Sequence, residues 1–164
     1  ARFGIDVRGC RFPGIISHGA LPGGGTTDYA VAIFYEAVKY GRYSCFLEPD
    51  TRLPMMYMPD CLKSIFDLMA AGFKNLRHHS DFNVTAMSFT PAELAAEIRR
   101  HLPGFEIDYR PDFRQAIADS WPQSLDDSAA RAEWSWKPDY DLAAMTADMI
   151  AVLKKRQAEG RLAY

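Results

Sequence analysis

The chain has 164 residues, of which 48% are hydrophobic and 13% aromatic, and its formal net charge at pH 7 is −2. A chain of this length can bury about two-thirds of its unfolded surface in one compact domain. The small net charge gives no electrostatic reason to bind nucleic acid or an anionic membrane. No window approaches the roughly 20 consecutive apolar residues of a membrane-spanning helix. We therefore expect neither nucleic acid nor a membrane among the partners.

The cysteines and histidines indicate no metal site. Cys10, Cys45 and Cys61 are odd in number, far apart, and form no C-x-x-C pair. This pattern favours reduced thiols in small buried positions over a disulfide framework or a zinc knuckle. His78-His79 has no acidic or cysteine partner at helical spacing, so we interpret it as an exposed loop.

Apolar periodicity and turn signals predict alternating strands and helices. The strands, from near-alternating apolar residues, are expected at 5–12, 43–47, 55–58, 81–87 and 105–109. The helices, from apolar residues three and four apart behind a capping residue, are expected at about 28–40, from 59 onward, at 90–101, 126–135 and 141–157. This alternation predicts the α/β class.

Two helix starts and one loop carry the most specific local signals. Thr90 and Glu93 have the spacing of a capping box, with proline at the first helical position. The helix that opens at Pro59-Asp60 has an apolar stripe made of Leu62, Ile65, Phe66 and Met69. Pro13-Gly14 ends the first predicted strand, and a loop is expected to follow.

Residues 22–29 read Pro-Gly-Gly-Gly-Thr-Thr-Asp-Tyr and form the most distinctive segment. Glycines let the backbone approach a ligand, and the unpaired N–H groups of a helix start favour a carboxylate or phosphate. The alternative, which these residues alone favour, is a flexible loop with Thr27 capping the helix. The segment is not a Walker loop, because no Lys-Ser/Thr follows the glycines.

Several segments in the same order resemble the threonine dehydrogenases of the extended short-chain dehydrogenase family. They are residues 11–17, 22–29, 51–60, 83–91, 111–122, 126–131 and 136–138. The resemblance implies the last strands and helices of a Rossmann-type parallel sheet plus a small carboxy-terminal substrate-binding lobe. It assigns residues 1–27 and 78–91 to the end of the dinucleotide-binding sheet and the active-site loops. It assigns residues 28–77 and 92–164 mainly to the lobe and the closing helices.

The resemblance also implies an activity, the NAD-dependent oxidation of L-threonine to 2-amino-3-oxobutanoate. The family's tyrosine base, the lysine four residues later and the Gly-rich fingerprint would lie upstream of Ala1, and no G-x-x-G-x-x-G occurs here. We therefore assign no catalytic residue to this chain and expect it to be inactive alone. Its expected partners are L-threonine and the amino-terminal half or a partner chain, with a homodimer when complete. Its expected compartment is cytoplasmic or mitochondrial, since the chain shows no targeting segment.

The resemblance implies two groups of contacts. The cofactor contacts, facing the nicotinamide of NAD, are Pro13, Gly14 and Ile15. The substrate contacts, holding the carboxylate and amino groups of the amino acid, are Gly25, Thr26 and Thr27.

Two further positions have alternative interpretations. Arg52 matches an arginine that contacts phosphate in sugar-nucleotide branches of the family, or it pairs with an acidic residue. Trp121 either lines the pocket or packs beneath it.

Tyr35 and Lys39 match the residue types and spacing of the catalytic Tyr-x-x-x-Lys pattern. Because they follow the first strand instead of preceding it, we interpret them as packing plus a solvated lysine.

Two other functions compete with this hypothesis. One is a fragment of a sugar-nucleotide epimerase or dehydratase, which needs a wider pocket and a second phosphate-binding arginine. Residues 119–124 (Asp-Ser-Trp-Pro-Gln-Ser) argue against it. The other is a non-catalytic module that binds an amino acid. Binding of L-threonine with and without NAD would distinguish the module from the dehydrogenase.

Overall fold

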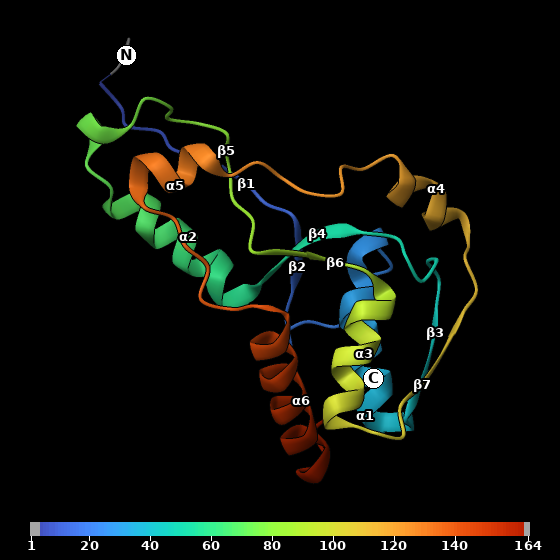
Figure 1. The fold of residues 1–164 in the computed structure, drawn as a ribbon. Helices are drawn as coiled ribbons and strands as arrows, with labels where there is room; N and C mark the ends of the chain where they lie inside the picture. The colour runs from blue at the N-terminus through green and yellow to red at the C-terminus, as the bar shows by residue number, and fades with distance from the viewer. Residues whose placement is uncertain (1–3, 163–164) are drawn as a thin grey trace.

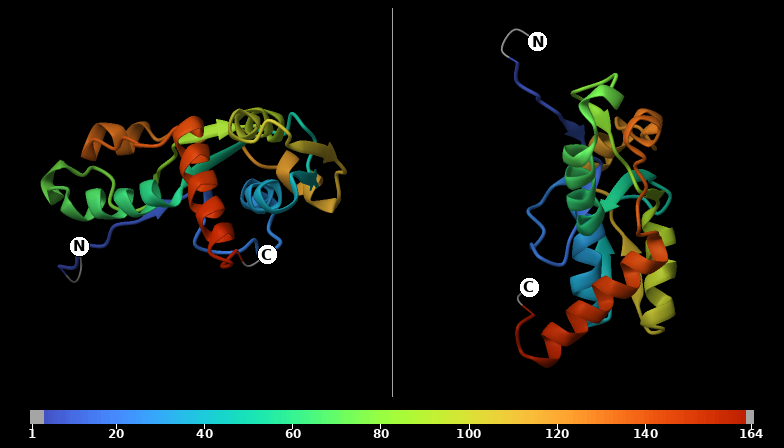
Figure 2. Two further views of the ribbon diagram at one scale, coloured as in Figure 1. Left: turned by 90° about the horizontal axis from the view of Figure 1, so that it is seen from below. Right: turned by 90° about the vertical axis from the view of Figure 1, so that its left-hand side faces the viewer.

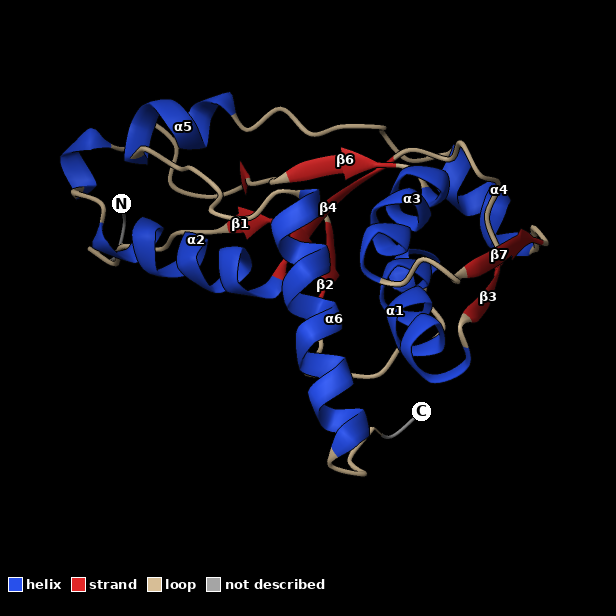
Figure 3. Cartoon of the chain, turned by 60° about the horizontal axis from the view of Figure 1, so that its bottom comes forward, coloured by secondary structure: helices blue, strands red, loops and turns tan. Residues whose placement is uncertain are grey.

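The computed structural model describes residues 4–162 and contains three small sheets in a row, seen in Figures 1 and 3. The middle sheet has the order β2-β4-β6, where β2 and β4 are parallel and β4 and β6 are antiparallel. Its strands are β2 (Gly14–Ile16), β4 (Leu53–Tyr57) and β6 (Met87–Phe89). The two flanking sheets are each one parallel pair. Their strands are β1 (Cys10–Arg11) with β5 (Phe82–Asn83), and β3 (Arg42–Cys45) with β7 (Glu106–Tyr109). The predicted α/β class is confirmed.

The helices divide between two hydrophobic cores (Figure 2). The larger core lies among α1 (Tyr29–Tyr40), α3 (Pro91–His101) and α6 (Leu142–Ala158). The smaller core lies between the β1–β5 pair and the helices α2 (Met58–Ala70) and α5 (Ser128–Trp134). Short helices complete the chain: η1 (Thr26–Asp28), η2 (Phe73–Asn75) and α4 (Phe113–Asp119).

Local capping sets the start of two long helices as the sequence predicts. Thr90 Oγ1 accepts a hydrogen bond from the Glu93 N–H at 3.2 Å, and Glu93 Oε2 accepts one from the Thr90 N–H at 2.9 Å. The capping box is therefore confirmed. The Asp141 carboxylate accepts a hydrogen bond from the Ala144 N–H at 2.8 Å, which fixes the start of α6.

Three predictions about strands and loops are wrong in detail, and one helix was missed. The strand expected at 81–87 is divided into β5 and β6, which belong to different sheets. The strand expected at 5–12 is reduced to β1, whose residues Cys10 and Arg11 pair with β5. The loop expected after Pro13 is instead β2, which pairs with β4. The helix α4 was not predicted, although Asp112 caps it by accepting from the Arg114 N–H at 2.9 Å.

The apolar stripe of α2 faces outward. The helix is confirmed, but Phe66 and Met69 are 65% and 69% exposed. The buried side carries Cys61, Leu68 and the carboxylate of Asp60. Asp60 accepts hydrogen bonds from the N–H groups of residues 139 and 140, at 2.8 and 3.1 Å, and burial raises its pKa. Hydrophobicity at helical spacing thus identified the helix but not the side that faces the core.

The cysteines and histidines take structural positions. The three cysteines are free thiols, of which Cys45 and Cys61 are buried and Cys10 is half-buried. Burial raises the pKa of the Cys10 thiol to about 11. The ring Nδ1 of His78 pairs with the carboxylate of Glu133 on α5. Within residues 4–162, no helix is long and apolar enough to cross a membrane.

Candidate functional site

A hollow of about 470 Å³ lies where the chain turns from β1 into β2. Four segments distant in sequence form its wall: the turn after β1 with the start of β2, the helix η1 before α1, the start of β4, and the segment after α4. Its lining residues are Phe12, Pro13, Gly14, Ile15, Thr27, Pro54, Trp121, Pro122 and Leu125. Most of this lining is apolar. The hollow brings together all three predicted cofactor contacts, one predicted substrate contact and Trp121.

Gly14 brings the turn into contact with the tip of α1. A Cβ atom at this position would lie 2.5 Å from Met55 Sδ and 2.7 Å from Thr27 Cγ2. Both distances are far inside van der Waals contact, so only glycine fits without movement of its neighbours. The absence of a side chain here sets how closely the predicted nicotinamide and amino-acid positions approach each other.

The glycines before α1 differ from the prediction in one respect. The N–H groups of Gly23 and Gly25 donate to Asp28 Oδ2, at 2.7 and 2.8 Å. These amides therefore face a carboxylate of the protein itself, whereas the sequence predicted that they face a ligand. Neither Gly25 nor the buried Thr26 lines the hollow, and Thr27 does. The substrate role of these three residues stays a prediction, with Thr27 best placed for it.

Arg52 is an ion-pair partner in this structure. Its Nη2 lies 2.6 Å from Glu93 Oε1, and its Nη1 donates to the Ser88 carbonyl at 2.7 Å. The guanidinium and the Thr90 N–H hold the pKa of Glu93 below its ordinary value. Of the two interpretations of Arg52, pairing with an acidic residue is the one that the structure contains.

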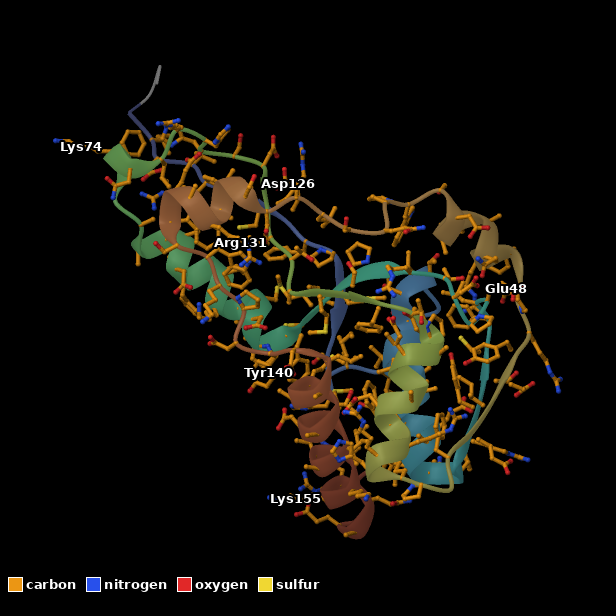
Figure 4. The ribbon with its side chains drawn as sticks, in the orientation of Figure 1. Glu48, Lys74, Asp126, Arg131, Tyr140 and Lys155 are labelled. Atoms are coloured by element: carbon orange, nitrogen blue, oxygen red, sulfur yellow. The ribbon has the colours of Figure 1, made fainter. Side chains whose placement is uncertain are left out.

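A second, polar hollow of about 460 Å³ adjoins the first across Trp121, which lines both and is 42% exposed. Its lining residues are Glu48, Asp50, Thr51, Arg52, Gln115, Ala118, Asp119, Trp121 and Gln123. Figure 4 shows Glu48 beside α4, at the opposite end of the molecule from Lys74. Carboxylates outnumber cations in this lining, which disfavours an anionic ligand.

Sequence reasoning missed Gln115, which organises the second hollow. Its Oε1 accepts from the Glu48 N–H at 2.8 Å, and its Nε2 donates to Asp119 Oδ1 at 2.6 Å. The spacing of Gln115 and Asp119, four residues apart on α4, was the available signal. Since α4 itself was not predicted, this signal was not used.

The Tyr35–Lys39 pair lies away from the hollow. Tyr35 is 2% exposed, and its phenol donates to the His18 carbonyl at 3.0 Å. It lies eight residues beyond Thr27, or about 12 Å along the helix axis at the α-helical rise per residue. Within residues 4–162, no group of three or more His, Cys, Asp or Glu side chains is placed to hold a metal ion.

The fold and the hollow together define a class of protein. The parallel β1–β5 pair is the end of a Rossmann-type sheet, and the chain connects its two strands through the middle sheet and α2. The hollow lies at the carboxyl end of β1. This is the fold of the carboxy-terminal half of short-chain dehydrogenases. No family model matches the chain.

The similar proteins include threonine dehydrogenases and uncharacterised epimerase/dehydratases. The bovine mitochondrial L-threonine 3-dehydrogenase is 54% identical over 150 residues, covering 91% of this chain and 40% of that protein. An uncharacterised epimerase/dehydratase of Staphylococcus haemolyticus is 50% identical over 157 residues, covering 95% and 49%. The crystal structure of L-threonine dehydrogenase from Phytophthora infestans superposes with a TM-score of 0.91 at 55% identity, covering 94% and 50%.

The GalE-like L-threonine dehydrogenase of Cupriavidus necator, in its holo form, is 56% identical over 92% of this chain and 49% of that one. A heptose epimerase of Helicobacter pylori, 15% identical with a TM-score of 0.66, shares the fold alone. The chain thus spans about half the length of the relatives it matches, and the matched part is their carboxy-terminal half.

Proposed function

We propose that this chain is the substrate-binding half of an NAD-dependent dehydrogenase that oxidises L-threonine to 2-amino-3-oxobutanoate. The observation that carries the proposal is the contact of the Gly14 turn with Thr27 at the wall of the apolar hollow. This contact supports the proposal, because the residues proposed to face the cofactor then lie next to Thr27, which is proposed to bind the amino acid. The high identity to threonine dehydrogenases over more than nine-tenths of the chain supports the same assignment.

The residues of the hollow fit a nicotinamide ring. Its apolar wall would accept the flat faces of the ring, and the backbone at Pro13, Gly14 and Ile15 would approach it closely. When bound, NAD supplies the hydride acceptor. The chain's own task is to orient the amino acid, and we propose that the hydroxyl of Thr27, which lines the same hollow, binds its charged groups. Gly25 and Thr26 would support Thr27, since the Gly25 N–H is held by Asp28.

The proton-transfer groups are proposed to come from an amino-terminal half. Among the described residues that line the hollow, none is a tyrosine or a lysine, and the Tyr35 phenol donates to the His18 carbonyl instead. The exposed stripe of α2 is proposed to contact that half. We further propose a homodimer for the complete protein. We expect a cytoplasmic or mitochondrial compartment, since bovine and porcine relatives are named mitochondrial.

The polar hollow disfavours a sugar-nucleotide substrate. A phosphate there would meet the carboxylates of Glu48, Asp50 and Asp119. The one arginine in the lining is already neutralised by Glu93. Burying a phosphate against uncompensated carboxylates is strongly unfavourable. A small zwitterion in the neighbouring apolar hollow avoids this repulsion.

The decisive experiment joins this chain to the amino-terminal half of the Cupriavidus necator enzyme. NADH formation from L-threonine is expected from the joined protein and not from the chain alone. Tyr35→Phe should retain activity within a few-fold, whereas loss of a true acid–base residue lowers rates by about 10²–10⁴-fold. Calorimetric binding of L-threonine, with no NADH formed by the joined protein, would instead favour a non-catalytic amino-acid-binding module. Robust NADH formation by the chain alone, lost in Tyr35→Phe, would contradict the proposal.

A further inference from the structure

Contacts from three elements converge on His18, two residues after β2 ends. Its carbonyl oxygen accepts hydrogen bonds from the Tyr35 phenol of α1, at 3.0 Å, and from Arg156 Nη1 of α6. Its ring Nδ1 lies 3.1 Å from Arg156 Nη2. The ring packs edge-on against Tyr57 of β4, with centroids 6.4 Å apart. The Arg156 guanidinium therefore holds both the backbone and the side chain of one residue.

His18 precedes the glycine loop, which we define as residues 19–25. The far end of this loop is held by Asp28, through the N–H groups of Gly23 and Gly25. Between the two ends the side chains pack little, since Leu21 is 52% exposed and residues 19, 20, 23 and 24 are exposed. The path of the loop therefore depends mainly on its two anchors. Thr27 of the candidate site is the second residue after the loop.

We propose that Arg156 is a positioning residue for the glycine loop, acting through His18 to set the path by which the loop reaches Thr27. This inference rests on the proposed function in that Thr27 binds the amino acid. Arginine suits this role because its planar guanidinium offers several donors in a fixed fork. A lysine ammonium in the same place would act as one point charge.

The contact with Nδ1 also requires a particular form of the imidazole. A guanidinium only donates hydrogen bonds, so Nδ1 must accept through its lone pair, and a protonated imidazole has none.

Amide hydrogen exchange of the chain without substrate tests the proposal directly. Arg156→Gln should speed exchange in the glycine loop by about tenfold or more, the effect of losing a hydrogen bond to a charged group. The amides of α1 and α3 should keep their rates. Arg156→Lys should give an intermediate rate, because one donor replaces the fork. Arg161→Gln is the matched control, since Arg161 lines the same hollow and pairs with Glu159.

A second variant keeps the test decisive if Arg156→Gln unfolds the chain. His18→Phe retains a ring against Tyr57 and the backbone carbonyl, and it removes Nδ1. At a single pH, His18→Phe should speed loop exchange less than Arg156→Gln does, because the bond from Arg156 to the carbonyl remains. Loop exchange at that pH that is the same in all these proteins would overturn the proposal.

The joined enzyme separates this inference from the proposed function. Arg156→Gln should raise the KM for L-threonine several-fold more than it lowers kcat. A natural KM beside a fast-exchanging loop would overturn the positioning role. Failure of the unmodified joined enzyme to oxidise threonine would contradict the proposed function, but it would not change what the exchange experiment says about the loop.

Discussion

Gly14 and Thr27 are in contact because residue 14 has no side chain: a Cβ atom there would lie 2.7 Å from Thr27 Cγ2. The two residues come from different elements, β2 and η1, and both line the candidate site. The close approach joins the part of the chain predicted to face the cofactor to the part predicted to bind the amino acid. A substitution at either residue should therefore change the position of the other.

We predict that Gly14→Ala destabilises the chain by about 1–3 kcal/mol, the usual cost of overpacking a tight site. The added methyl group must displace both Met55 Sδ, 2.5 Å away, and Thr27 Cγ2. Urea unfolding measures the change in the free energy of unfolding. Thr27→Ser removes Cγ2 and keeps the hydroxyl, so it should recover part of the loss in the double variant.

Gly104→Ala is the matched control for this prediction. A Cβ atom at Gly104 meets no atom within 4 Å, and the residue lies in the turn before β7. Its substitution should change the free energy of unfolding by less than about 1 kcal/mol in either direction. Equal free energies of unfolding for Gly14→Ala and the unmodified chain would contradict the prediction, because Met55 and Thr27 would then leave room for a methyl group at residue 14.

Asp28→Ala should release the N–H groups of Gly23 and Gly25 and lower stability by about 1 kcal/mol. Asp28→Asn keeps one oxygen acceptor and should lose less. Exchange of the two glycine amides, followed by NMR, reports the released bonds directly. If Asp28→Ala instead tightened L-threonine binding in the joined enzyme, these amides would be ligand groups that Asp28 occupies in the free protein.

Local chemistry explains which parts of the fold could be predicted from the sequence. The start of α3 depends on Thr90 and Glu93, which lie three residues apart, so their spacing was sufficient. The register of β1 depends on β5, where Cys10 lies opposite Phe82, and no local pattern encodes so distant a partner. For the same reason the sequence identified α2 but not its buried side.

The features of the candidate site likewise divide into those that could be predicted from the sequence and those that could not. Gly14 and Thr27 could be named beforehand because the resemblance to threonine dehydrogenases implies their contacts, and the helix-start pattern also points to the hydroxyl of Thr27. The capture of the Gly25 amide by Asp28 could not be predicted, because a capping carboxylate and a ligand carboxylate satisfy the same N–H groups. The pairing of Arg52 with Glu93 needed the antiparallel pairing of β4 with β6, which places Leu53 opposite Phe89.

The ion pair of Arg52 with Glu93 should make part of the stability dependent on pH. Because the pKa of Glu93 is lowered from 4.5 in the folded chain, its contribution is present above pH 4.5 and is lost as the pH falls through the folded-state pKa. Glu93→Gln should therefore be less stable than the unmodified chain near neutral pH, and this difference should shrink as the pH falls through the folded-state pKa of Glu93. The difference should be at most about 1 kcal/mol, since both side chains are more than one-third exposed.

Urea unfolding at a series of pH values measures this convergence. Glu106→Gln, at an exposed carboxylate of β7, is the control and should show a difference that does not vary in this way. A constant difference between Glu93→Gln and the unmodified chain at every pH would mean that the variant acts through packing or capping, and not through the charge of Glu93.

The exposed stripe of α2 should control association. Phe66 is 65% exposed beside the exposed Leu62 and Met69, and apolar side chains that gather on one face mark an interaction surface. Phe66→Glu should leave the free energy of unfolding within about 0.5 kcal/mol, as is usual for a surface substitution. It should reduce self-association of the chain in sedimentation experiments and weaken binding to a separately produced amino-terminal half of the Cupriavidus necator enzyme.

Tyr40→Glu, on an aromatic residue of α1 that is 56% exposed, is the control and should change neither property. Equal loss of association in both variants would indicate a general effect of charge and would remove the α2 stripe as the contact surface.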